Sequence, residues 1–332
     1  MRQVRAAFTG RGVVRQGVLI RALLGLSACA LTALVYIPAA DHPFVLDDRT
    51  RVVLNPALVD PGDLGAVVRA DPWHPLIDLS FAGDVGVSGV SSFGFHLTNA
   101  SLHVLVVALL FVLVSRRPED VFRRRPKTAG AGGKAPSDPA AWWAAFLAAG
   151  VFGLNPITVR SAAYVSARGD MLFTAGVLLL ALLAHRFRAA ARGPKIAVAM
   201  VAALMLAANP WGVAPHGPPR FYLTAAVLLL AAGWASRPLL ARSRGLRVAA
   251  AMAVAALILV TRGSLAQWHD PVELWRAEAA RAPAASDAHL GYADALREAS
   301  SCGQAVPEYR EALRLNPDLG AARDGLSRCH AR

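Results

Sequence analysis

The chain has 332 residues, of which 55% are apolar and 17% are charged, and its mean hydropathy is positive. A soluble domain of this length carries more charge, so the composition predicts a membrane protein with several spans. The net charge of +13 is high enough for a nucleic-acid-binding protein. However, the arginines occur in short clusters between apolar runs, as in cytoplasmic loops, and we therefore expect no nucleic-acid partner.

Seven apolar stretches are long enough to cross a hydrocarbon core of about 30 Å, which requires about 17 to 25 residues. The first has a basic head and ends at Pro38-Ala39-Ala40, so a cleaved signal peptide is the alternative interpretation. Its length and the six stretches after it favour a span. The sequence thus predicts an all-α protein, with a polytopic helix bundle over 1–262 and a helical tail over 263–332. The predicted spans lie near 18–38, 97–115, 140–156, 171–187, 195–211, 220–236 and 246–262.

Lysine and arginine are concentrated in residues 1–17, 116–139, 185–195 and 236–247, and are sparse in the alternate loops. Positive residues mark cytoplasmic loops, so the N-terminus is expected in the cytoplasm. Seven spans then place the tail outside, in the same compartment as the first outer loop, 39–96. We expect a multi-pass protein of the cell membrane, or of the inner membrane in a bacterium. The Gly- and Pro-containing segment 116–139 is interpreted as a flexible cytoplasmic linker.

The three cysteines are too few for a disulfide framework, and their spacing differs from that of zinc sites. Cys29 lies within the first predicted span and is expected to be a small buried hydrophobe. Cys302 and Cys329 both lie in the tail. They are able to form a disulfide if the tail is outside the cytoplasm, and the sequence leaves this open.

Two adjacent carboxylates, Asp47 and Asp48, follow the first predicted span. An ionisable pair at the edge of a membrane is a functional candidate, and a surface ion cluster with Arg49 and Arg51 is the alternative.

Three polar residues at the start of the second span, His96, Asn99 and His103, have the spacing of one helix face. They are expected to line a site near the carboxylates, with packing at the membrane interface as the alternative. No third metal ligand accompanies the two histidines in the sequence, so no metal site is predicted.

The tail matches the 34-residue tetratricopeptide pattern when Pro317 is set at the proline position. Trp275 and Pro283 precede Tyr309 and Pro317 by one period each. The pattern predicts a half repeat, one full repeat and the first helix of another, stacked as helical hairpins. Such a stack holds an extended peptide or serves as a packing cap. The residues expected to pack are Trp275, Tyr292, Ala305, Tyr309, Ala312 and Pro317.

Several outer-loop motifs occur in a characteristic order along the chain. This order resembles the transmembrane tetratricopeptide-repeat proteins of the GT-C glycosyltransferase class, which are relatives of protein O-mannosyltransferases. The resemblance covers nearly the whole chain except roughly 184–215. The motifs are Phe44-Val45-Leu46-Asp47-Asp48-Arg49, Asn55-Pro56, Pro75-Leu76, Ser80-Phe81, the run from Gly94 to His103, Asn155-Pro156, Arg168-Gly169-Asp170, and the run from Trp268 to Trp275.

The resemblance implies transfer of a sugar, mannose being one candidate, from a polyprenyl-phosphate donor to a protein hydroxyl on the non-cytoplasmic side. In such enzymes an acidic residue of the first outer loop is the base, so Asp47 or Asp48 would accept the hydroxyl proton. Arg168 would face the lipid phosphate, with helix anchoring as the alternative. The implied partners are membrane lipid, the lipid-linked donor, and a protein or peptide acceptor held by the tail. No covalently bound cofactor is implied, and the requirement for a divalent metal stays open.

The chain departs from this family pattern at several positions. Asn155 stands where relatives usually have histidine, and Arg160 stands where they usually have glutamate. Relatives also carry more spans, so part of the donor groove is expected to be absent. These departures support an alternative function, a non-catalytic membrane-anchored repeat scaffold derived from such an enzyme.

Overall fold

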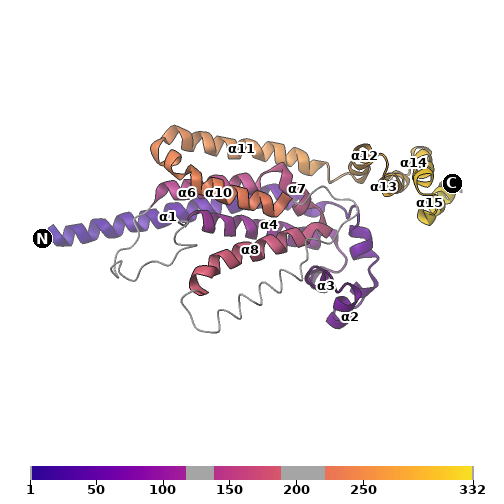
Figure 1. The fold of residues 1–332 in the computed structure, drawn as a ribbon, viewed down its shortest axis with the longest axis horizontal. Helices are drawn as coiled ribbons and strands as arrows, with labels where there is room; N and C mark the ends of the chain where they lie inside the picture. The colour runs from indigo at the N-terminus through magenta and orange to yellow at the C-terminus, as the bar shows by residue number, and fades with distance from the viewer. Residues whose placement is uncertain (1, 117–137, 188–220, 331–332) are drawn as a thin grey trace.

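The computed structural model describes residues 2–116, 138–187 and 221–330, and every regular element in these ranges is helical (Figure 1). The all-α prediction is therefore confirmed for the described ranges. The predicted span at 195–211 and nearly all of the predicted linker lie outside the described residues.

Five described helices are long and apolar enough to cross a membrane. A sixth candidate is the pair α6 (Pro139–Gly153) and α7 (Pro156–Ala163), which is bent by 60°. The described ranges thus support a multi-pass membrane bundle with five or six spans, and the predicted number of seven stays a prediction. The five single helices are α1 (Arg2–Tyr36), α4 (Ser92–Val114), α8 (Arg168–Phe187), α10 (Phe221–Arg242) and α11 (Arg244–Ala266).

The bend between α6 and α7 follows from the sequence at Asn155-Pro156. Proline disfavours the helical conformation in the residue before it, so α6 ends at Gly153 and Asn155 has an extended backbone. The Asn155 side chain accepts a hydrogen bond from the backbone N–H of Ile157 at 3.0 Å, which caps the start of α7.

The bundle is closely packed around α6, which contacts α1, α4 and α10. Glycines permit the close approaches: a Cβ on Gly150 would lie 2.9 Å from Val254, and one on Gly233 would lie 2.6 Å from Val114. The α1 helix packs as a member of the bundle and buries Ala28 against its neighbours.

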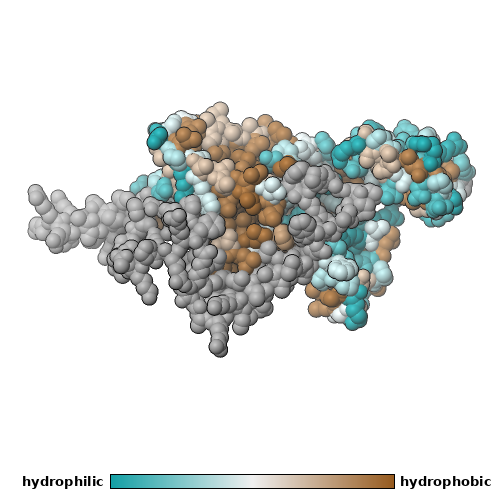
Figure 2. All heavy atoms as spheres, viewed as in Figure 1, coloured by the Kyte–Doolittle hydropathy of each residue, from teal (hydrophilic) through white to brown (hydrophobic). Residues whose placement is uncertain are grey.

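The two ends of the bundle differ. The first outer loop and the tail lie at one end, whereas the N-terminus lies at the other (Figure 1). Figure 2 shows apolar side chains over the middle of the bundle and polar ones over much of the tail. At the N-terminal end, Arg237 donates to the backbone carbonyls of Val114 and Arg116, which satisfies acceptors at the end of α4.

The outer loop contains the short helices α2 (Leu64–Ala70) and α3 (Pro75–Ser88). Short helices near 62–70 and 74–82 are what the sequence indicates, and both are confirmed, although α3 is longer than expected. Single turns at Ile37–Asp41, Arg49–Val53 and Pro56–Leu58 connect the loop to α1. Its side chains form a separate apolar cluster together with Val165, which lies in the turn before α8. The residues of the loop in this cluster are Val52, Leu58, Val67, Ile77, Phe81, Ala82 and Phe95.

The tail consists of four helices, α12 (Pro271–Arg281), α13 (Ser286–Glu298), α14 (Cys302–Leu315) and α15 (Gly320–His330), each packed on the next. The 34-residue period recurs in their contacts. A Cβ on Gly291 would lie 2.5 Å from the Trp275 ring, and one on Gly325 would lie 2.3 Å from the Tyr309 ring. The tail is therefore a helical stack with a repeated contact, whereas its tetratricopeptide class stays a prediction.

The residues expected to pack in this stack differ in burial. Ala305, Tyr309 and Ala312 are fully buried, and Trp275 and Tyr292 are half-buried. Pro317 is exposed, because it lies in the loop before α15, so the expectation that its side chain packs inside was wrong.

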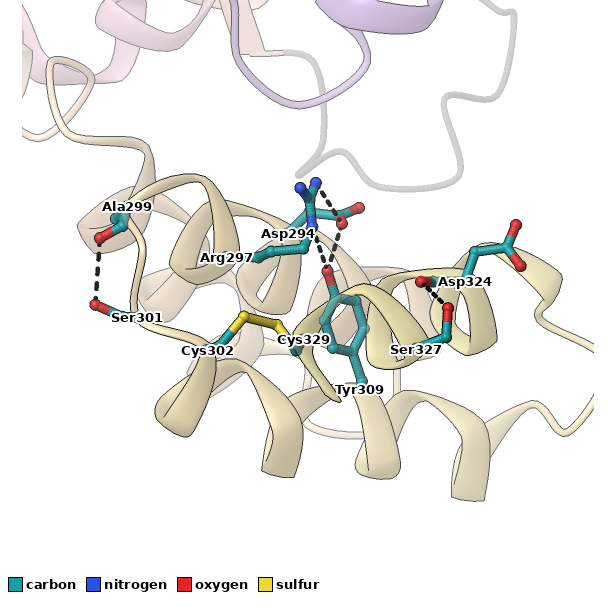
Figure 3. The surroundings of a disulfide bond; sticks show 9 residues. All are labelled: Asp294, Arg297, Ala299, Ser301, Cys302, Tyr309, Asp324, Ser327 and Cys329. Carbon is teal, nitrogen blue, oxygen red and sulfur yellow. Dashed lines mark hydrogen bonds and ion pairs between the residues drawn. A yellow bond between two sulfur atoms is a disulfide. The ribbon is translucent and has the colours of Figure 1, made fainter. Parts of the chain in front are cut away.

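A disulfide joins Cys302 to Cys329 and thereby links the start of α14 to the end of α15 (Figure 3). Beside it, the Tyr309 hydroxyl donates to Asp294 at 2.7 Å and accepts from Arg297 at 3.0 Å. The turn between α13 and α14 lies at Ser300, whose φ is +59°. The sequence predicts a turn near the middle of the repeat, marked by Gly303, with Ser300 at the helix break. The break does lie at Ser300, and Gly303 is the second residue of α14.

Candidate functional site

The acidic doublet lies at the outer end of the bundle, between the end of α1 and the turn that precedes α8. Leu46, directly before the doublet, has a φ of +53°, which is unfavourable for a residue with a side chain. The side chain of Leu46 packs against the core of the bundle. Packing therefore holds the backbone in a conformation that the residue itself disfavours, and this sets the direction of the two carboxylates.

Asp48 is completely buried. One carboxylate oxygen accepts hydrogen bonds from the Ser166 backbone N–H at 2.8 Å and from its hydroxyl at 2.6 Å. The other oxygen accepts from the Val45 N–H at 3.3 Å. Burial raises the pKa of Asp48 to about 7, and the hydrogen bonds from Ser166 and Val45 oppose this rise. Asp48 thus fastens the outer loop to the start of α8.

Asp47 is the more accessible of the two carboxylates and is partly exposed. Its backbone N–H donates to the Tyr164 hydroxyl at 3.3 Å. Burial raises the pKa of Tyr164, and the negative charges of Asp48 and Asp47 raise it further. The Arg160 guanidinium lies 5.6 Å from the centre of the Tyr164 ring and interacts electrostatically with Asp47 and Glu278. A carboxylate, a phenol and a guanidinium therefore meet at this point.

Arg168 lies inside the protein, with no exposed surface. Its guanidinium forms an ion pair with Asp84 at 2.6 Å and donates to Asn99 at 2.7 Å. It also donates to Ser80 and to the Phe95 carbonyl, both at 3.1 Å, and it stacks over the Phe81 ring at 4.7 Å. In this arrangement Arg168 connects α3, α4 and α8, and its contacts are with protein groups.

The three polar residues on the α4 face have separate surroundings. Asn99 accepts from Arg168 and donates to the Tyr164 carbonyl at 3.1 Å, so it connects the buried arginine to the doublet's neighbour. His103 lies deeper in the bundle, where one ring nitrogen contacts the Tyr222 hydroxyl at 2.7 Å and the other the Gly153 carbonyl at 3.1 Å. His103 therefore fastens α4 to α6 and α10 instead of lying at the doublet.

His96 is buried beside the Pro43 carbonyl, which its Nε2 approaches at 3.4 Å. Its ring centre lies 6.1 Å from that of His42, which in turn lies 5.5 Å from that of His269. Among the described residues, no group of three histidine, cysteine or acidic side chains has an arrangement that could hold a metal ion.

Two acidic residues of α3 complete the outer loop and are not identified by sequence reasoning. Asp84 pairs with Arg168 and accepts from the Thr98 hydroxyl at 2.7 Å. Asp78 is buried and lies 3.6 Å from Arg51. Burial raises the pKa of Asp78 to about 6, whereas the Arg51 charge lowers it. Their signal in the sequence is weak, since it consists of two charges in an otherwise uncharged 14-residue helix.

Comparison with known proteins yields one partial similarity. The chain is 30% identical over 105 residues to Protein O-mannosyl-transferase Tmtc1 of Drosophila melanogaster. The alignment covers 27% of this chain and 12% of the fly protein. No family model matches the chain, and no solved structure matches it. The chain is therefore similar, over about a quarter of its length, to a protein O-mannosyl-transferase.

Proposed function

We propose that the protein is a membrane glycosyltransferase that transfers a sugar from a polyprenyl-phosphate donor to a protein hydroxyl on the non-cytoplasmic side. The observation that carries the proposal is the partial similarity to a protein O-mannosyl-transferase. The multi-pass helix bundle supports it, because the donor is a lipid and its reactive end lies at a membrane surface. The carboxylates at one end of the bundle supply a candidate base at that level.

Of the two carboxylates, Asp47 is the better candidate for the base, because it is partly exposed whereas Asp48 is enclosed by Ser166 and Val45. The acceptor oxygen attacks the anomeric carbon, and its proton passes to the Asp47 carboxylate. The bond from the anomeric carbon to the phosphate oxygen breaks, and the polyprenyl phosphate leaves with the electron pair. Asp48 acts as a positioning residue in this scheme.

The departing phosphate requires a cation. Arg160, which interacts with Asp47 and Tyr164, is at the more accessible place, whereas Arg168 is enclosed by Asp84 and Asn99. We assign phosphate binding to Arg160. Arg168 instead holds α8 against α3 and α4 through its contacts with Asp84 and Asn99. His96 and Asn99 then support the site from α4, and His103 supports the bundle beneath it.

The tail adjoins this end of the bundle. Glu298 of α13 forms an ion pair with Arg49 at 2.5 Å, and Glu278 of α12 interacts with Arg160. If the tail is a tetratricopeptide stack that holds an extended peptide, these contacts keep the acceptor near Asp47. The disulfide in the tail supports a non-cytoplasmic location, since structural disulfides persist in oxidising compartments.

The test is sugar transfer from a polyprenyl-phosphate-linked mannose to protein, measured in membranes that contain the full-length chain. The Asp47→Asn variant should lose transfer at least tenfold, and Asp41→Asn, an exposed acid of the same loop, should retain it. Equal amounts of protein in the membrane exclude a folding effect. Transfer that persists in both Asp47→Asn and Asp48→Asn would contradict the proposal.

A second candidate function is a non-catalytic scaffold that displays the tail outside the membrane. Two observations favour it. Arg160 stands where an acid is expected in the family, and the Arg168 guanidinium binds protein groups, namely Asp84, Asn99 and Ser80. For a scaffold, wild-type membranes should show no transfer above the level of membranes without the protein. Turnover of a lipid-linked sugar by the purified protein would exclude this function.

A further inference from the structure

The charges of helix α3 all point inward. Its 14 residues include two charged side chains, Asp78 and Asp84. Asp78 lies against Arg51, and Asp84 lies against Arg168 and Thr98. A helix whose outer side faced water would be expected to carry polar and charged residues there.

The outward face of α3 carries no charge within Pro75–Ser88. Its exposed positions are Gly83, Gly86, Val87 and Ser88, and Val87 is 91% exposed. A Cβ added to either glycine would meet no atom within 4 Å, so this side is open. The inward side of α3 thus carries both of its charges beside the apolar residues Ile77, Phe81 and Ala82, and its exposed side has no charged residue.

The exposed apolar face continues into the membrane-spanning helix that follows. Val90 lies in the connection, and Phe93 and Leu97 lie in the first two turns of α4, with exposed fractions of 51%, 51% and 41%. Because α4 is a candidate span, its exposed apolar residues face lipid. The exposed apolar positions thus continue along the chain from α3 into a candidate span.

The position of α3 in the molecule agrees with contact with the bilayer. Figure 1 shows α2 and α3 to one side of the bundle near its outer end, whereas the tail lies beyond that end. Figure 2 shows apolar areas beside polar ones in this region. At about 1.5 Å per residue, α3 is about 21 Å long, which is too short to cross a core of about 30 Å. Trp73, next to its start, is 75% exposed, and tryptophan is enriched at membrane interfaces.

We propose that α3 rests on the non-cytoplasmic leaflet, with Gly83, Val87 and Val90 at the boundary between headgroups and acyl chains. The occupant of this face is the bilayer itself. The inference is independent of catalysis and holds equally for a transferase and for a scaffold. Asp84 and Asp78 of α3 form ion pairs with Arg168 and Arg51. Contact between α3 and the bilayer then fixes the distance of the outer loop from the membrane surface.

The test uses the full-length protein in lipid nanodiscs made of phosphatidylcholine and phosphatidylglycerol. A nitroxide is attached at Val87→Cys or Val90→Cys after the free cysteine is removed by Cys29→Ser, with the tail disulfide left intact. Electron paramagnetic resonance then measures the collision of the label with oxygen, which partitions into lipid, and with a water-soluble nickel chelate. Leu97→Cys serves as the lipid-facing control and Asp324→Cys as the water-facing control.

We expect the Val87 and Val90 labels to resemble Leu97, with oxygen collisions at least several-fold above those with nickel. Nickel collisions as frequent as at Asp324 would overturn the proposal in favour of a face exposed to water. Low collision rates with both reagents would overturn it as well, because the face would then be covered by protein, either another segment of the chain or a second copy. The two labelled positions separate a local distortion from a property of the whole face.

Discussion

At the scale of single residues, the adjacent acids Asp47 and Asp48 differ in burial and in the hydrogen bonds of their carboxylates. Three donors surround its carboxylate, yet removal from water raises its pKa to about 7. Asp47, one residue earlier, keeps access to solvent. The two adjacent acids therefore differ in their surroundings: Asp48 is enclosed by protein donors, and Asp47 is partly exposed.

The raised pKa of Asp48 predicts a pH dependence of stability. Between pH 3.8, its ordinary pKa, and about pH 7, the folded state holds a proton that the unfolded state has released. The contribution of Asp48 to folding stability is therefore greatest below pH 4 and is lost as the pH rises to about 7. Unfolding by SDS in mixed micelles, measured at pH 5 and pH 8, should show a loss on the order of 3 kcal/mol that Asp48→Asn removes. An unchanged pH slope in Asp48→Asn would contradict this assignment.

The ion pair between Arg168 and Asp84 predicts strong coupling between two residues that are far apart in the chain. Removal of one partner leaves a buried charge without its counter-ion and costs about 3 to 5 kcal/mol, whereas removal of both restores electrical balance. We expect Asp84→Leu with Arg168→Met to cost clearly less than the two single variants added together. SDS unfolding of the four proteins measures the coupling, and strictly additive costs would refute it.

Several residue-level features were predictable from the sequence, and others were not. The acidic doublet could be found because it adjoins an apolar run, and Asn99 could be placed on a helix face with His96. The difference between Asp47 and Asp48 depends on Ser166, more than a hundred residues away, and no local pattern contains that information. The same holds for His103, whose partners on α6 and α10 lie far along the chain.

At the scale of elements, helix ends were predictable where proline or a capping residue sets them, and less so where tertiary contacts decide. The Asn155-Pro156 pair ends one helix and begins another. In contrast, α3 extends beyond the expected range, to Ser88, because its inward residues pack on the outer-loop cluster and Gly89, with a φ of +63°, ends it.

The repeated glycine contact in the tail predicts opposite effects for two similar substitutions. Gly291→Ala places a methyl group within 2.5 Å of the Trp275 ring and should destabilise the tail by about 1 to 3 kcal/mol. Gly303→Ala meets no atom within 4 Å and should be neutral or stabilise α14 by about 0.5 kcal/mol. Amide hydrogen exchange in the full-length protein measures both, in α12 and α13 for Gly291→Ala and in α14 for Gly303→Ala. Equal protection in the two variants would show that the contact contributes nothing.

At the scale of the whole molecule, the outer loop and the tail lie at the same end of the bundle (Figure 1). The ion pair between Arg49, next to the doublet, and Glu298 of the tail joins the two. The composition and the apolar runs predicted the membrane bundle, because burial in lipid imposes a strong constraint on every residue of a span. The number of spans was less predictable, since the α6–α7 pair is bent and one predicted span lies outside the described residues. The distribution of lysine and arginine among the loops predicts that the N-terminus is cytoplasmic, and this orientation can be tested.

The proposed orientation predicts which side of the membrane the tail cysteines occupy. In intact cells treated with a membrane-impermeant reductant, an impermeant maleimide should label Cys302 and Cys329, because the proposed orientation places the tail and its disulfide outside. Without the reductant, labelling should be absent. A cysteine placed in the predicted cytoplasmic linker, Ala131→Cys, should be labelled only after the membrane is permeabilised. The reverse pattern would invert the orientation.

The left-handed backbone at Leu46 links the stability of the bundle to the geometry of the doublet. Since packing against the core holds this residue in place, any loosening of the outer end of α1 releases the conformation that aims Asp47 and Asp48. The doublet should therefore lose its alignment in small opening fluctuations, well before the spans separate. Leu46→Gly removes both the strain and its anchor. The loop would then be more relaxed and the carboxylates less well directed, so precision at this site is maintained at the expense of local stability.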